Sequence, residues 1–127
     1  MLVQAATLCL ALNIYHEARG EPVKGQIAVG LVTMNRANWN VEKICPVVYA
    51  PKQFSWTSIK KPSEYHPPTH NKSWKKAQNL AERIIKGEME DHTKGATYFH
   101  AQSVNPYWSS SLERTVVIGN HIFYASR

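Results

Sequence analysis

Residues 14–22 read IYHEARGEP, and this stretch decides how the N-terminal half of the chain is arranged. Ahead of it, apolar residues recur at steps of three and four, the spacing of one helical face: Val3, Ala6, Leu10 and Ile14. The next step along the same face is Glu17. The sequence therefore predicts a helix over residues 2–17 whose last turn points a carboxyl group toward the core.

Two residues of the stretch predict a boundary between helices. Gly20 is a natural helix stop, and Pro22 suits the first turn of a following helix. Beyond it a second apolar stripe begins, made of Val23, Ile27, Leu31 and Met34. Two helices are expected to meet at the quoted stretch.

The rest of the chain divides into helical and strand-like segments. A short helix capped by Asn40 is expected in NVEKICPVVYA, with Pro46 limiting it to its C-terminal half or to a turn. Another helix is expected over residues 74–86, ended by Gly87. In the tail, ATYFH, RTVVI and HIFYA are β-rich, and Gly119-Asn120 is a hairpin signal between the last two. The prediction is an α+β fold, a helical core beside a small antiparallel β-sheet near the C-terminus.

Length and composition limit the possible functions. The 127 residues suit one domain, residues 1–127, and 15 Lys and Arg against 9 acids give a net charge of +6, which favours an anionic partner. The apolar opening lacks a basic n-region, so it is interpreted as mature structure rather than a signal peptide, and no run is long enough for a membrane span. Cys9 and Cys45 are expected to be buried free thiols.

The position of Glu17 has a chemical consequence. Partial desolvation and the negative end of the helix dipole both disfavour its carboxylate, so its pKa is expected to rise. A carboxylic acid that stays protonated near neutral pH can protonate the leaving oxygen of a glycosidic bond. Glu17 is therefore the candidate general acid. The alternative is an ordinary surface ion pair, since Arg19 could hold either Glu17 or Glu21.

Metal chemistry is not supported by the histidines. A zinc-protease helix beginning at His16 would need a second histidine at position 20, which is Gly. His66 and His70 have helical spacing, but the two prolines between them favour a polar loop. No metal and no cofactor are expected.

The aromatic residues of QFSW, YFH and NPYWS could either belong to the core or stack on sugar rings.

Five blocks occur along the chain in a set order: NIYHEARGEPVKGQIAVGLVTMNR, VVYAPKQFSW, DHTKGATYFHA, NPYWS and IGNHIFY. In this order they resemble the spore cortex-lytic (SleB-like) cell wall hydrolase family over nearly the whole chain. The resemblance implies a lysozyme-like catalytic core that degrades peptidoglycan, with Glu17, the first glutamate of EARGE, as the catalytic acid. It also implies that further positions line or brace the sugar groove: Glu21, Gln26, Asn35, Arg36, Phe54, Ser55, Trp56, Tyr98, His100, Trp108 and His121.

The sequence departs from the family pattern in two ways. Spore-type relatives carry a leader and a wall-binding repeat domain, so their absence here favours a phage endolysin made in the cytoplasm and released through a membrane lesion. A bacterial housekeeping enzyme is the alternative. Many relatives also carry a cysteine after FSWT that suits pairing with the position of Cys45. Ser58 stands there in this chain, so that bridge is not expected.

The expected reaction is cleavage of the β-1,4 bond between N-acetylmuramic acid and N-acetylglucosamine. The sugar cation can be captured by the muramic 6-hydroxyl, as in a lytic transglycosylase, or by water, as in a muramidase. The resemblance favours the first. So does the scarcity of acids that could serve as a second catalytic group, because Asp91 is the sole aspartate and suits loop ordering equally well.

The two rival classes are a non-catalytic wall-binding module and a nucleic-acid-binding protein. The lysines of this chain form no recognised nucleic-acid-binding motif, which weighs against the nucleic-acid-binding class. The chain is expected to be a monomer that binds peptidoglycan, with no nucleic acid and no stable membrane insertion.

Overall fold

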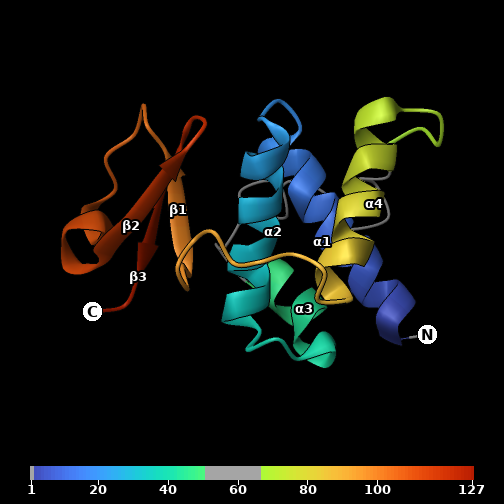
Figure 1. The fold of residues 1–127 in the computed structure, drawn as a ribbon, viewed down its shortest axis with the longest axis horizontal. Helices are drawn as coiled ribbons and strands as arrows, with labels where there is room; N and C mark the ends of the chain where they lie inside the picture. Colours follow the sequence, from blue (N-terminus) through green and yellow to red (C-terminus); the bar gives the residue numbers. More distant parts are fainter. Residues whose placement is uncertain (1, 51–66) are drawn as a thin grey trace.

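The computed structural model describes residues 2–50 and 67–127, which form a group of α-helices followed by an antiparallel sheet (Figure 1). The helices are α1 (Leu2–Ala18), α2 (Val23–Arg36), α3 (Val41–Val48) and α4 (Lys72–Ile85). The strands are β1 (Tyr98–Ala101), β2 (Glu113–Ile118) and β3 (His121–Ala125), and the 3₁₀ helix η3 (Tyr107–Ser111) precedes β2. The α+β prediction is confirmed. No helix in these ranges combines the length and the apolar character needed to cross a membrane.

Helix α1 is the centre of the helical core. It packs against α2, α3 and α4, and Figure 1 shows it between α2 and α4. Residues 10–14 are all buried, which includes every side of the helix. The predicted single stripe was too narrow, because a helix with partners on three sides buries most of its surface. This stripe was also wrong at Val3, which is 55% exposed, and the predicted stripe of α2 was wrong at Val23, which is 41% exposed.

Helix α3 begins at the predicted cap. The side chain of Asn40 accepts a hydrogen bond from the backbone N–H of Glu42 at 3.0 Å. The helix continues on both sides of Pro46, so the expectation that Pro46 confines it was wrong. Proline removes one hydrogen bond from the helical ladder and crowds the carbonyl four residues before it, and this short helix, which packs against α1, tolerates both.

The two cysteines are joined in a disulfide, Cys9–Cys45, which corrects the expectation of free thiols. Their Cα atoms lie 5.3 Å apart although 36 positions separate them in the sequence. The reason is tertiary, because α1 and α3 pack side by side and bring the two positions together. The bridge therefore staples α3 to the central helix.

Helix α4 starts two residues before the predicted start and stops where the sequence indicates. The side chain of Asn71 accepts a hydrogen bond from the N–H of Trp74 at 3.0 Å, which caps its first turn. At the other end Gly87 has φ +78° and donates to the Ile84 carbonyl, and Glu88 donates to the Arg83 carbonyl. This pair of bonds is the Schellman ending that glycine favours.

The sheet has the strand order β1-β3-β2, with both pairs antiparallel. The predicted Gly119-Asn120 hairpin joins β2 to β3, and Gly119 has φ +57°. One face packs on α2, through a buried cluster that contains Ala28, Val29, Val32, Ile118 and Phe123. Because side chains alternate along a strand, Tyr98, His100 and Tyr124 lie on the opposite face. We call this opposite face the outer face of the sheet.

Candidate active site

Glu17 lies in the last turn of α1, half-buried, as its place in the sequence predicts. Burial raises the pKa of its carboxyl group from 4.5 to about 7. Within residues 2–50 and 67–127 its side chain makes no hydrogen bond and no ion pair that would favour the charged form. Near neutral pH this group can therefore hold a proton and release it, which is what a general acid and base must do.

Arg19 does not neutralise either glutamate of the quoted stretch. Its guanidinium turns back over the ring of Tyr15, 4.8 Å from the centroid, and donates to the Tyr15 carbonyl at 3.2 Å. In the described part of the chain Arg19 forms no ion pair with Glu17 or with Glu21. The surface ion pair considered as an alternative is therefore not formed there.

Glu21 joins the corner between α1 and α2 to the sheet. Its side chain is 16% exposed, and its Oε1 accepts a hydrogen bond from the N–H of Asn120 at 2.7 Å. The Nδ1 atom of His121 lies 3.6 Å from the same oxygen. Burial lowers the pKa of His121, Glu21 opposes this shift, and His100 adds to it. The imidazole is thus held toward its neutral form beside the carboxylate.

Gln26 braces the same corner from within α2. Its side chain is 5% exposed, and Nε2 donates to the backbone carbonyl of Glu21 at 2.9 Å. The carbonyl of Ala18 accepts the N–H of Glu21 at 2.9 Å, which closes the turn after α1. Both predicted groove residues of this corner, Glu21 and Gln26, thus make contacts that hold it in shape.

Asn35 and Arg36 attach the end of α2 to the segment leading into β1. Asn35 donates through Nδ2 to Asp91 Oδ2 at 3.0 Å and to the Ala96 carbonyl at 2.9 Å. Arg36 donates to the Thr97 carbonyl at 3.0 Å and lies 4.7 Å from the centroid of the Tyr98 ring. Burial lowers the pKa of Arg36, and its interaction with Tyr98 opposes that shift. These contacts position β1 against α2.

Asp91 orders the loop that Asn35 contacts. Burial tends to raise the pKa of Asp91, but hydrogen bonds from Thr93, Asn35 and Gly95 outweigh it and hold the pKa below its usual value. The backbone donors lie at 2.8 Å from Thr93 and 3.0 Å from Gly95. Of the two roles that the sequence left open for Asp91, these contacts favour loop ordering over catalysis.

Three predicted groove residues gather on the outer face of the sheet and beside it. Trp108, in η3, has its ring centroid 5.2 Å from that of Tyr98 and 5.7 Å from that of His100. Tyr124 completes the cluster, since its hydroxyl contacts His100 Nε2 at 2.8 Å and its ring lies 5.5 Å from Trp108. The sequence reasoning missed Tyr124, although the alternation of HIFYA places it on the same face as Ile122 and opposite Phe123.

The predicted residues do not all meet at one point. His121 faces the helices, where its ring lies 5.0 Å from that of Phe99, while Tyr98, His100 and Trp108 form the outer cluster. Phe54, Ser55 and Trp56 lie outside the described residues. Within residues 2–50 and 67–127, no group of three or more His, Cys, Asp or Glu side chains is arranged to hold a metal ion.

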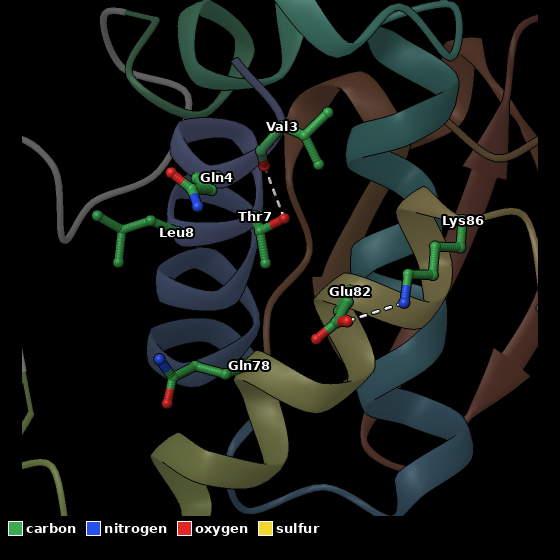
Figure 2. A pocket seen from close by; sticks show the side chains of 7 residues that line it. All are labelled: Val3, Gln4, Thr7, Leu8, Gln78, Glu82 and Lys86. Carbon is green, nitrogen blue, oxygen red and sulfur yellow. Dashed lines mark hydrogen bonds and ion pairs between the residues drawn. The ribbon is translucent and has the colours of Figure 1, made fainter. Parts of the chain in front are cut away.

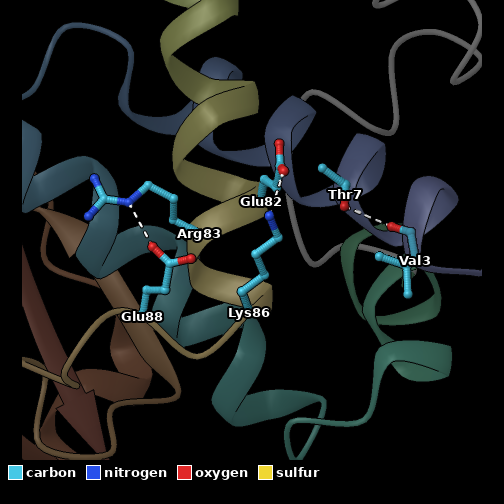
Figure 3. A network of polar contacts seen from close by, with 6 residues as sticks. All are labelled: Val3, Thr7, Glu82, Arg83, Lys86 and Glu88. Atoms are coloured by element: carbon cyan, nitrogen blue, oxygen red, sulfur yellow. Dashed lines mark hydrogen bonds and ion pairs between the residues drawn. The ribbon is translucent and has the colours of Figure 1, made fainter.

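A mainly apolar groove between α1 and α4 lies away from Glu17. It has a volume of about 360 Å³ and is lined by residues of the N-terminal half of α1, such as Val3 and Leu8, and by Gln78, Glu82 and Lys86 (Figure 2). In its wall Lys86 pairs with Glu82 at 2.9 Å, and on the same helix Arg83 pairs with Glu88, which follows it, at 3.3 Å (Figure 3). All four charged side chains are about half exposed, so these pairs contribute little to stability.

Comparison with known proteins gives consistent results for sequence and structure. The Cell Wall Hydrolase family profile matches residues 20–124, a range that begins after Glu17. The spore cortex-lytic enzyme of Halalkalibacterium halodurans is 32% identical over 117 residues, which cover 90% of this chain and 33% of that protein. The enzyme of the same name from Bacillus subtilis is 28% identical over 116 residues, covering 90% and 35%. The chain thus spans about a third of the length of these curated relatives.

Two solved structures share the fold. The catalytic domain of the germination-specific lytic transglycosylase SleB from Bacillus anthracis has a TM-score of 0.76 at 26% identity, covering 96% of this chain and 95% of that one. The catalytic domain of Bacillus cereus SleB has a TM-score of 0.73 at 26% identity, covering 96% and 91%. Because the family profile matches most of the sequence and these folds agree over nearly all of it, the chain belongs to the cell wall hydrolase family.

Proposed function

We propose that this chain cleaves the glycan strands of peptidoglycan as a lytic transglycosylase, with residues 1–127 acting as one catalytic domain. The bond broken is the β-1,4 link between N-acetylmuramic acid and N-acetylglucosamine. Membership of the cell wall hydrolase family and the names of the related catalytic domains support this proposal. The observation that carries the mechanism is the half-buried Glu17, whose carboxyl group has a pKa of about 7.

In the proposed mechanism Glu17 acts twice. Its protonated carboxyl group gives a proton to the bridging oxygen, so that the bond from this oxygen to C1 of the muramic sugar breaks and a C1 cation forms. The resulting carboxylate then takes the proton of the muramic 6-hydroxyl, whose oxygen bonds to C1. The product is a 1,6-anhydro ring, and Glu17 regains its proton. A pKa near 7 suits both steps, because neither form is strongly favoured.

The contacts of Glu21 and Asp91 support a mechanism with one carboxyl group. Glu21 accepts the N–H of Asn120, and Asp91 accepts donors from its own loop. Neither is therefore placed as a free nucleophile in the described part of the chain. Capture of the cation by water, as in a muramidase, remains the second candidate, because it needs the same acid and differs only in the acceptor.

The remaining predicted residues take two roles in the proposal. Glu21, Gln26 and Asn35 are positioning residues that hold the end of α1, the start of α2 and the loop before β1. Tyr98, His100, Trp108 and His121, with Phe54, Ser55 and Trp56, are proposed to bind or shape the glycan path. The protein is proposed to act on the cell wall as a monomer that needs no cofactor.

The test is mass spectrometry of the fragments that purified protein releases from isolated peptidoglycan in heavy-oxygen water. The proposal expects 1,6-anhydro ends that carry no heavy oxygen. Reducing ends that carry heavy oxygen would mean that water captured the cation, and the enzyme would then be a muramidase. Glu17→Gln keeps the shape of the side chain but cannot donate the proton, so it should abolish release, whereas the exposed Glu90→Gln should not. Release by Glu17→Gln at the wild-type rate would remove Glu17 from the mechanism.

A further inference from the structure

A second cavity lies on the outer face of the sheet. Its volume is about 490 Å³, and its walls come from all three strands, from the loop after β1, from η3 and from the C-terminal residue Arg127. His100, Ile122 and Tyr124 form its strand side, and they alternate with residues such as Phe123 that face α2. The cavity therefore lies on the face of the sheet that does not pack on α2.

The cavity is positively charged. Arg114 and Arg127 line it, and none of its described lining side chains is acidic. Arg127 donates through Nη2 to the carbonyls of Ser110 at 3.3 Å and Leu112 at 3.4 Å, which fixes its guanidinium beside η3 and leaves its other donors available. The side chain of Arg114 makes no hydrogen bond or ion pair within the described ranges. Glu113 lies in an adjoining hollow with both arginines but pairs with neither there.

The floor of the cavity is built from hydrogen-bonded side chains. His100 Nδ1 lies 2.7 Å from the Ala101 carbonyl, which can only accept, so Nδ1 carries a hydrogen. In the neutral ring Nε2 is then the acceptor, and the Tyr124 hydroxyl donates to it at 2.8 Å. Asn105 adds an amide, and Ser109 adds a hydroxyl whose proton goes to the Pro106 carbonyl. These groups offer hydrogen-bond acceptors and an amide donor beside the guanidinium groups of Arg114 and Arg127.

We infer that this cavity binds a short peptide through its carboxylates. Two guanidinium groups from different segments suit carboxylates, and the neutral amide and hydroxyl groups between them suit a peptide backbone. Its volume falls within the range of roughly 300–1,000 Å³ that is usual for small-ligand sites. The source we assign, resting on the proposed function, is the acidic stem peptide that peptidoglycan carries on its muramic sugars.

The experiment titrates wild-type protein with a free stem tetrapeptide, and with the same peptide amidated at its carboxyl groups, by calorimetry at low salt. The free acid should bind about tenfold more tightly, and Arg114→Gln should weaken its binding roughly five- to tenfold. The side chain of Arg114 is exposed and makes no described hydrogen bond or ion pair, so this variant should fold normally. Lys76→Gln removes one exposed charge on α4 and is the matched control, which should bind like wild type.

Three results would overturn the inference: equal binding of the amidated peptide, no effect of Arg114→Gln, or tighter binding of inorganic phosphate than of the acid peptide. Cleavage of peptide-free glycan strands, measured in parallel, separates this inference from the proposed function. Arg114→Gln should leave that cleavage unchanged. Peptide binding without cleavage would refute only the proposed function, and cleavage without peptide binding would refute only the peptide site.

Discussion

The Glu21 carboxylate accepts a hydrogen bond from the backbone N–H of Asn120 at 2.7 Å, across a sequence separation of 99 residues. This bond ties the corner between α1 and α2 to the turn between β2 and β3. Glu17 lies one helical turn before that corner. The contact therefore fixes where the end of α1, with its buried carboxyl group, stands relative to the sheet.

Removing this acceptor should loosen the junction between helices and sheet. We expect Glu21→Ala to lower the free energy of unfolding by about 1–3 kcal/mol, because the hydrogen bond between the Glu21 carboxylate and the N–H of Asn120 is lost. Urea unfolding followed by circular dichroism measures the change. Glu90→Ala removes an exposed side chain with no described hydrogen bond or ion pair, so it is the control and should change stability little. A Glu21→Ala variant as stable as the control would mean that the contact does not hold the junction.

Gly119 should tolerate substitution poorly for two separable reasons. Its φ of +57° disfavours other residues, and an added Cβ would lie 2.5 Å from Glu21 Oε1. Gly95→Ala is the matched control, because φ is +80° there but nothing lies within 4 Å. We expect Gly95→Ala to lower stability by about 1 kcal/mol and Gly119→Ala by clearly more. Thermal unfolding gives both values. Equal losses would show that the Glu21 side chain gives way without strain.

Activity should decline as the pH rises through about 7. Glu17 must carry a proton to start the proposed reaction, and its folded-state pKa is about 7. Above that pH the rate should fall roughly tenfold per pH unit, as the protonated fraction does. Initial rates on isolated peptidoglycan at constant ionic strength test this. A rate that stays flat from pH 6 to pH 9 would contradict the role of Glu17 as the acid.

The same pKa predicts a pH dependence of stability. The folded pKa lies above the unfolded value of 4.5, so the folded state binds more protons between pH 4.5 and about 7, and wild-type stability should decline as the pH rises through this window. Glutamine does not titrate, so Glu17→Gln lacks this pH-dependent contribution to stability. Its stability relative to wild type should therefore grow between pH 4.5 and 7, by roughly 3 kcal/mol at most. Denaturant unfolding at pH 4.5 and pH 8 measures this, with Glu90→Gln as control. A difference that does not change with pH would mean that burial does not shift this group.

The disulfide should make the helical core sensitive to reductants. Replacing both Cys9 and Cys45 with Ala should lower the free energy of unfolding by roughly 2–4 kcal/mol, mainly because the unfolded chain loses a cross-link. Unfolding curves of wild type with and without dithiothreitol should differ by a similar amount, and those of the double variant should coincide. A wild-type curve that reductant leaves unmoved would show that the bridge contributes nothing.

Local features of the fold could be predicted from the sequence because they depend on neighbours along the chain. The steps of three and four before Glu17 predict a helix that turns this residue inward, and burial does raise its pKa. Gly87 ends α4, and the Gly119-Asn120 turn joins β2 to β3, as predicted. Backbone preferences of a few adjacent residues decide such features.

Contacts between distant segments were decided only by the tertiary structure. From the sequence we expected Cys9 and Cys45 to be free thiols, left two roles open for Asp91 and placed His121 and His100 at one groove. Packing of α1 on α3 formed the disulfide, the end of α2 fixed Asp91 through Asn35, and strand alternation put His121 and His100 on opposite faces. In each case the partner lies many residues away, or on a face that only the packed sheet defines. The local pattern determined which way Glu17 points, but packing determined what holds it there.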